Sequence, residues 1–161
     1  MARTASQAAR SAFSSPTEST RASWPKVKSA AEQEDVNVEL VAPTVGGIEA
    51  GDGSRMPADQ KVDGGPSVLY DAVIVLTTKS GATTLAAMPA AHDFVTDAYA
   101  HCKFIGYAGE PGPLFEAAGL ASLMDDGFIS LDEHSAADFI SRCGQLRFWA
   151  RQEGMVKAAA G

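Results

Sequence analysis

The sequence predicts an α/β fold, a three-layer sandwich built around a mostly parallel sheet. Two short apolar runs, residues 36–42 and 71–77, are rich in β-branched side chains, as are strands buried on both faces of a parallel sheet. Segments with helical periodicity alternate with such runs, an order typical of helices that cover both faces of the sheet. A chain of 161 residues, 45% of them hydrophobic, suits one domain with its own core.

The first 24 residues differ in composition from the rest. They are rich in Ser, Thr, Ala and Arg and show no sustained apolar period. Residues 1–24 are therefore expected to form a disordered tail, and residues 25–161 to form the domain. An acid-poor, Arg- and Ser-rich start is also compatible with a mitochondrial transit peptide, whereas a secretory signal is not expected because an apolar h-region is missing.

The first predicted helix covers residues 26–34, with Pro25 near its first turn. The strand 36–42 follows and ends before Pro43, and a loop rich in Gly, Asp and Pro leads to the strand 71–77. This loop is longer than most connections between elements. Such loops are typical of functional or docking surfaces.

The same loop contains three aspartates, Asp52, Asp59 and Asp63, whose carboxylates are of the type that binds calcium. The ligand spacing and the terminal Glu of an EF-hand loop are both missing. Aspartate and glycine are also residues that turns require. Turn formation is therefore favoured over a metal site.

The second half of the chain continues the alternation. Residues 78–88 are expected to form a polar loop with a short helical turn. Pro89 starts a helix with an apolar stripe of Phe94, Val95, Ala98 and Cys102, which makes Cys102 a core thiol. Further on, the sequence predicts a strand over residues 103–108, a turn over 109–113, a helix over 114–119 that ends on Gly119, and a strand over 128–131.

The last helix is expected to begin near Ser135, which has capping-box-like spacing to Asp138. One stripe along this helix contains Phe139, Cys143, Leu146 and Trp149 or Ala150. Three basic residues lie toward its C-terminal end, where the helix dipole favours positive charge: Arg142, Arg147 and Arg151.

Charge and composition exclude several classes of function. The net charge of −7 leaves no basic stripe to neutralise phosphates, so a nucleic-acid partner is not expected. No apolar run approaches the roughly 20 residues of a membrane span. Cys102 and Cys143 have no CxxC spacing, and His92, His101 and His134 are scattered, so no metal site or disulfide is predicted. A reducing, cytoplasmic location is the expectation.

Four blocks of the sequence, spread over residues 27–152, carry a family resemblance. The chain resembles the C-terminal domain of large-subunit haem catalases, which implies a flavodoxin-like fold related to the class I glutamine amidotransferase superfamily. It also implies a connection with hydrogen peroxide detoxification and oxidative stress. The blocks are VAPTVGGIEAGDGSRMPADQKVDGGPSVLYDAVIV, HDFVTDAYAHCKFIGYAGE, LFEAAGL and ADFISRCGQLRFWARQ.

The resemblance implies no active site in this chain. Superfamily relatives that do chemistry place a cysteine at an elbow, a strained turn directly after a strand. The corresponding position here is Ala108, and Cys102 lies before the strand. The haem ligands of the resembled catalases belong to a larger N-terminal core. No catalytic, cofactor-binding or metal residue is therefore assigned, and Tyr70, Tyr99 and Tyr107 are expected to be structural.

The resembled domain also opens with a strand that lies inside the sheet. Nothing in residues 1–24 resembles it, so the sheet is expected to lack this first strand. Its loss would leave hydrogen-bonding edges unpaired and make the chain marginally stable or oligomeric alone. A truncated or frameshifted gene, a start site within a longer reading frame, or a strand supplied by another chain would each explain the difference.

Three functional hypotheses follow. The first is a non-catalytic accessory domain of a catalase, with the catalase core or further copies of the chain as partners and the loop before Pro66 as a docking surface. The second is a free-standing stress or chaperone-like protein. The third is an amidotransferase-like enzyme with unusual chemistry, against which Ala108 counts.

Overall fold

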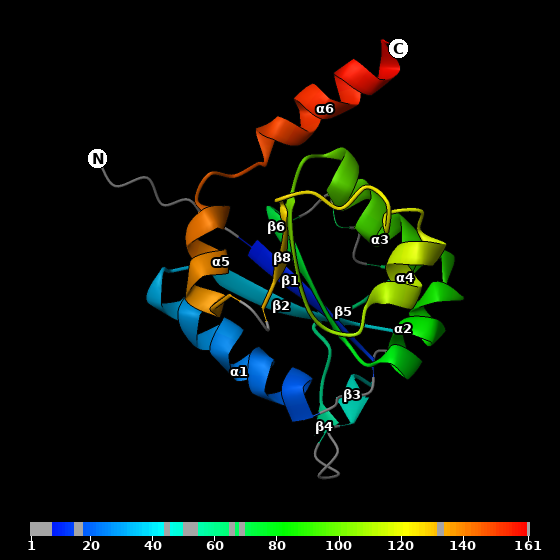
Figure 1. The fold of residues 1–161 in the computed structure, drawn as a ribbon. Coiled ribbons are helices and arrows are strands. Elements are labelled where there is room, and N and C mark those ends of the chain that lie inside the picture. The colour runs from blue at the N-terminus through cyan, green and yellow to red at the C-terminus, as the bar shows by residue number, and fades with distance from the viewer. Residues whose placement is uncertain are drawn as a thin grey trace.

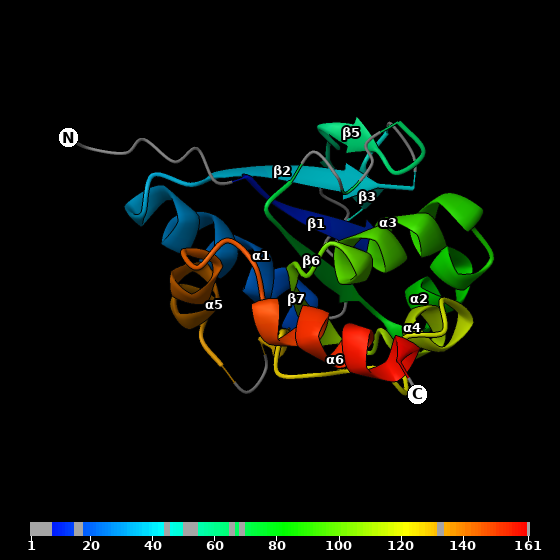
Figure 2. The same ribbon diagram turned by 90° about the horizontal axis from the view of Figure 1, so that it is seen from above.

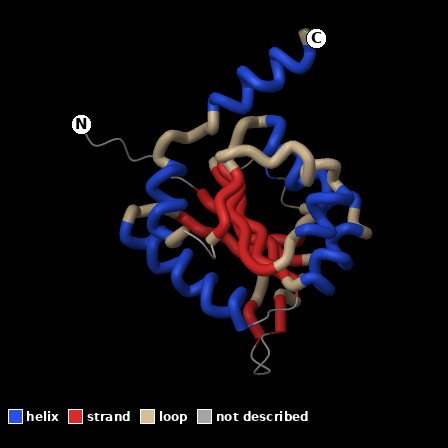
Figure 3. Tube along the Cα trace, viewed as in Figure 1, coloured by secondary structure: helices blue, strands red, loops and turns tan. Residues whose placement is uncertain are grey.

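The computed structural model describes residues 8–14, 18–43, 46–49, 55–64, 67, 70–131 and 134–160. A parallel six-stranded sheet in the order β5-β2-β1-β6-β7-β8 forms the middle layer between helices (Figures 1 and 3). The predicted three-layer α/β architecture is confirmed. The strands are β1 (Ala8–Ser14), β2 (Asn37–Ala42), β5 (Gln60–Lys61), β6 (Ala72–Thr77), β7 (Phe104–Gly109) and β8 (Phe128–Ser130).

Helices cover both faces of this sheet. Helices α1 and α5 lie on one face and α2, α3 and α4 on the other, while α6 extends beyond the sheet (Figures 1 and 2). A small antiparallel pair, β3 (Ile48–Glu49) with β4 (Arg55–Met56), lies in the loop after β2. The helices are α1 (Glu18–Gln33), α2 (Lys79–Ala86), α3 (Pro89–Ala100), α4 (Gly112–Ala117), α5 (Ala136–Cys143) and α6 (Trp149–Ala159).

The unbroken apolar run of β6 is explained by its two buried faces. Ile74 and Leu76 belong to the core under α1 and α5, whereas Val73 and Val75 belong to the core under α2, α3 and α4. Successive side chains of a strand point to opposite faces. Residues 72–76 of β6 are all apolar because each of them faces a helical layer.

The N-terminal prediction needs correction. Residues 8–14 are not a disordered tail but the strand β1, which pairs in parallel with both β2 and β6. The sheet thus has an interior strand at the position where none was expected. The sequence AARSAFS did not predict a strand because it has no β-branched residue. Its backbone amides and carbonyls can nevertheless pair with the two neighbouring strands. Residues 1–7 and 15–17 lie outside the described residues.

Helix α1 also begins earlier than predicted, at Glu18, and includes Pro25. The prediction started after this proline because proline interrupts the interior of a helix. Burial of Val27, Ala30 and Ala31 against the sheet stabilises the helix on the C-terminal side of the proline. Tertiary packing here outweighs a local signal.

Two further elements differ from the prediction. The segment expected to be a polar loop after β6 is the full helix α2, capped by Thr78, whose side chain accepts a hydrogen bond from the Gly81 amide at 3.0 Å. The single predicted helix from Ser135 is two helices. Leu146 has a φ of +66°, which a helix does not tolerate, and the chain turns between α5 and α6 at this point.

Candidate functional site

The carboxyl ends of the strands are where ligands bind in open parallel sheets, and the predicted elbow lies there. Ala108 is fully buried inside β7, paired with Leu76. The strained backbone belongs to the next residue, Gly109, with a φ of +78°. The Glu110 amide then donates to the Thr77 carbonyl at 2.9 Å. The positive φ thus lies at Gly109, one residue after Ala108, the predicted elbow position.

The threonine hydroxyl groups at the carboxyl ends of the strands make hydrogen bonds to the backbone. Thr78 caps α2, and the Thr77 hydroxyl donates to the Thr78 carbonyl at 3.1 Å. Glu110, in the turn itself, is exposed. The turn from Gly109 to Pro111 offers no thiol or hydroxyl side chain that could attack a substrate.

Both cysteines are buried thiols. Burial, together with a smaller contribution from the nearby carboxylate of Asp71, raises the pKa of Cys143 to about 12. A thiol is nucleophilic only as the thiolate, so Cys143 is inert at neutral pH. Cys102 follows α3 with a φ of +56° and is 5% exposed, which agrees with its predicted place in the core.

The predicted tyrosines and histidines do not come together in one site. Tyr107 packs edge-on against Phe115, and the Tyr70 hydroxyl donates to Glu39 at 3.4 Å. His92 Nε2 lies 2.5 Å from the Ala86 carbonyl oxygen, and His134 is 3.9 Å from Asp138. Of the loop aspartates, Asp59 accepts from the Leu40 amide and Asp63 pairs with Lys61, each at 2.7 Å, while Asp52 lies outside the described residues.

A buried ion pair that the sequence did not predict lies at the amino ends of the strands, opposite the carboxyl ends just described. The Arg151 side chain, 1% exposed, donates from Nε and Nη2 to the two carboxylate oxygens of Asp125 at 2.6 and 2.8 Å. Its Nη1 donates to the Lys103 carbonyl at 2.8 Å. The guanidinium also lies 4.6 Å from the Tyr99 ring centroid. This arrangement satisfies the buried charge and anchors the first turn of α6.

A buried lysine lies beside this pair. The Lys103 ammonium donates to the Ser67 carbonyl at 2.5 Å, and the residue is 1% exposed. The pKa of Lys103 is lowered from 10.5 to about 8, mainly by burial and also by the nearby charge of Arg147, while Asp71 and Asp97 partly oppose the shift. The lysine thus links Ser67 to the start of β7.

This lysine makes stability depend on pH. Between about pH 8 and 10.5 the unfolded chain keeps a proton on Lys103 that the folded chain has released, so the free energy of unfolding is expected to rise across this window. Urea unfolding at both ends of the window should show a smaller rise for Lys103→Met than for the wild type. Lys28→Met, at an exposed site on α1, is the control. Parallel pH curves for wild type and Lys103→Met would contradict the assignment.

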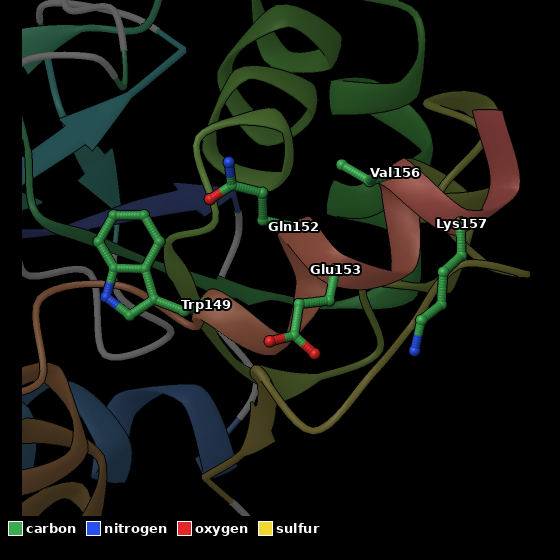
Figure 4. Close-up of a pocket in the computed structure, with 5 residues that line it drawn as sticks. All are labelled: Trp149, Gln152, Glu153, Val156 and Lys157. Atoms are coloured by element: carbon green, nitrogen blue, oxygen red, sulfur yellow. The ribbon is translucent and has the colours of Figure 1, made fainter. Parts of the chain in front are cut away.

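Helix α6 exposes an unusual amount of apolar surface. Beside it lies a groove of about 670 Å³ between the helix and residues 122–126. A second groove of about 420 Å³ is lined by Trp149, Gln152, Glu153, Val156 and Lys157 (Figure 4). We use the term α6 surface for the five residues of this second groove. Its composition is that of an interaction surface rather than of a catalytic centre.

A family model for the C-terminal domain found in long catalases matches residues 13–153. The chain belongs to this family. Among curated proteins it is 53% identical over 124 residues to Catalase C of Rhizobium meliloti (strain 1021), which covers 76% of the chain and 18% of that protein. It is 33% identical over 143 residues to Catalase HPII of Mycobacterium avium, covering 79% of the chain and 20% of that protein. The chain thus spans about a fifth of these relatives.

The family match confirms the predicted resemblance, and a solved structure agrees with the fold. A two-domain protein from Anabaena variabilis ATCC 29413, with DJ-1/ThiJ/PfpI-like and ferritin-like domains, aligns with a TM-score of 0.69 at 11% identity, over 86% of this chain and 48% of that one. This likeness supports the flavodoxin-like assignment alone. In the described part of this catalase C-terminal domain, no helix has the length and apolar character needed to cross a bilayer.

Proposed function

We propose that this chain is a non-catalytic accessory domain of a large catalase, acting in hydrogen peroxide detoxification through contact with the haem-containing core of such an enzyme. The observation that carries the proposal is the 53% identity to Catalase C over 76% of the chain. Identity at this level over 124 residues supports a shared role for the domain.

The elbow supports a role without chemistry. Its residue with positive φ is Gly109, and the turn from Gly109 to Pro111 has no thiol or hydroxyl side chain that could act as the nucleophile. Covalent catalysis of the kind that superfamily relatives perform would need such a group.

The described residues also do not fit haem. An iron ligand such as tyrosine must face an open cavity, but Tyr107 packs on Phe115 and Tyr99 is covered by Arg151. Tyr70 is 4% exposed. The haem of the proposed holoenzyme would therefore be held by the core alone.

A domain exchange in Catalase C of Rhizobium meliloti tests the proposal. Three proteins are compared: the intact enzyme, the enzyme without the matching segment, and a chimera in which this chain replaces that segment. The chimera is expected to recover the thermal midpoint and the oligomeric state of the intact enzyme, because the domain restores contacts that the shortened protein lacks. The isolated chain is expected to release no oxygen from peroxide.

Two outcomes would contradict the proposal. One is a chimera that behaves like the shortened enzyme. The other is peroxide decomposition by the isolated chain. A third result would favour the stress-protein hypothesis over the accessory-domain proposal. In that case the isolated chain suppresses aggregation of an unrelated protein, and the chimera recovers neither the thermal midpoint nor the oligomeric state.

A further inference from the structure

All the exposed large hydrophobic side chains in the described part of the chain lie at one end of the molecule. Trp149 and Val156 are 61% and 62% exposed, and they belong to α6. Leu123 and Met124 lie between α4 and β8, and Leu146 lies between α5 and α6. An apolar concentration of this kind on a domain marks a contact surface.

Helix α6 is held to its own domain at one end and by one side only. The Phe148 amide donates to the Cys102 carbonyl at 2.6 Å, and Arg151 is the buried residue of the helix. Beyond this first turn α6 extends away from the sheet (Figure 1). A helix of 11 residues is marginal in water without packing, so a partner on its open faces would stabilise it.

The position of α6 indicates which partner this is. Cys102 and Lys103 directly precede β7, so α6 is anchored at the amino ends of the strands. Because β1 is parallel to its neighbours, it begins at the same edge. The family is the C-terminal domain of long catalases, so in those proteins the preceding chain is joined to the domain at its amino-terminal side. The catalase core therefore approaches the domain from the amino ends of the strands, where α6 is anchored.

Charge argues against a second copy as the occupant. The α6 surface carries both signs of charge, because Glu153 and Lys157 lie on the same side of the helix (Figure 4). Two copies of a chain with a net charge of −7 repel one another overall. A partner with an apolar contact centre and a positive net charge would complement this chain.

We propose that the α6 surface is the docking face for the catalase core, with Trp149 and Val156 at the centre of the contact. The inference rests on the proposed function and adds the location of the interface and the chemistry of the facing surface. Tryptophan is enriched among the residues that dominate binding energy at such centres.

The test uses the haem-loaded chimera of Catalase C with this chain. A photo-cross-linking residue, benzoylphenylalanine, is introduced at Trp149 or Val156, and at Glu32 and Glu116 as controls on exposed faces of α1 and α4. After irradiation, mass spectrometry identifies the linked peptides. Cross-links from Trp149 and Val156 to core peptides, with none from the controls, are expected.

A second measurement separates docking from folding. In the chimera, Trp149→Ser with Val156→Ser is expected to increase the rate of proteolytic release of the domain by about thirtyfold, the equivalent of one interface hot spot, while Lys28→Ser with Glu32→Ser leaves the rate unchanged. Circular dichroism of each free chain checks that the fold is retained.

The two proposals fail differently. If the chimera is restored but the cross-links come from the control positions, or join α6 to another copy, the docking assignment is wrong and the accessory function stands. If the chimera is not restored in stability or assembly, the proposed function itself fails.

Discussion

Asp125→Ala is expected to lower the free energy of unfolding by about 3 kcal/mol, the range measured when one partner of a buried ion pair is removed. The substitution leaves the guanidinium of Arg151, 1% exposed, without its carboxylate. It also removes the hydrogen bond from the Gly127 amide to Asp125 Oδ1 at 2.9 Å, which forms the turn before β8. Urea unfolding followed by circular dichroism measures the loss.

Asp126 provides the matched control. It is the next residue in the chain and is exposed, so Asp126→Ala is expected to change stability by less than about 0.5 kcal/mol. Arg151→Lys should resemble Asp125→Ala, because an ammonium cannot make the bidentate contact and the stacking together. Equal stabilities for the two aspartate variants would show that the buried pair does not anchor α6.

Phe139→Ala is expected to cost about 3–5 kcal/mol, the usual loss for a fully buried aromatic side chain. Phe139 is fully buried on the face of α5 that packs on the sheet. A Cβ added to Gly106 of β7 would lie 2.9 Å from its ring, so the ring fills the space that this glycine leaves. Truncation opens a cavity between α5 and the middle of the sheet.

A double-mutant cycle tests this packing in detail. Gly106→Ala alone should be destabilising because the new methyl group collides with the ring, and it should cost less in a Phe139→Ala background. Ser141→Ala, at an exposed site on α5, is expected to be near neutral. Additive effects of the Gly106 and Phe139 substitutions would rule out the contact.

The parts of the fold that were predictable are those with a strong local signal. The β-branched runs of β2 and β6 and the N-cap at Ser135, whose hydroxyl accepts from the Asp138 amide at 3.0 Å, all lie where the sequence places them. Strand β1 was missed because its small and polar residues are held by pairing with two neighbours. The break at Leu146 depends on a backbone angle that no residue type signals.

The candidate surface was harder to predict than the fold. Arg151 was read as a charge that complements a helix dipole, but its partner Asp125 lies 26 residues earlier in the chain. Only the packing of α3, β7 and β8 brings the two together. Trp149, which with Ala150 as the alternative was predicted to continue the apolar stripe of α5, is 61% exposed, because the chain turns at Leu146 between α5 and α6.

The burial of the two cysteines has a consequence for a domain that we propose to be carried by a peroxide-consuming enzyme. Peroxide converts thiolates to sulfenic acids and then to irreversible products, and the rate follows thiolate content and exposure. Cys143 has a pKa of about 12, and both thiols are shielded by packed side chains. The domain is thereby built to survive prolonged exposure to the substrate of its proposed partner.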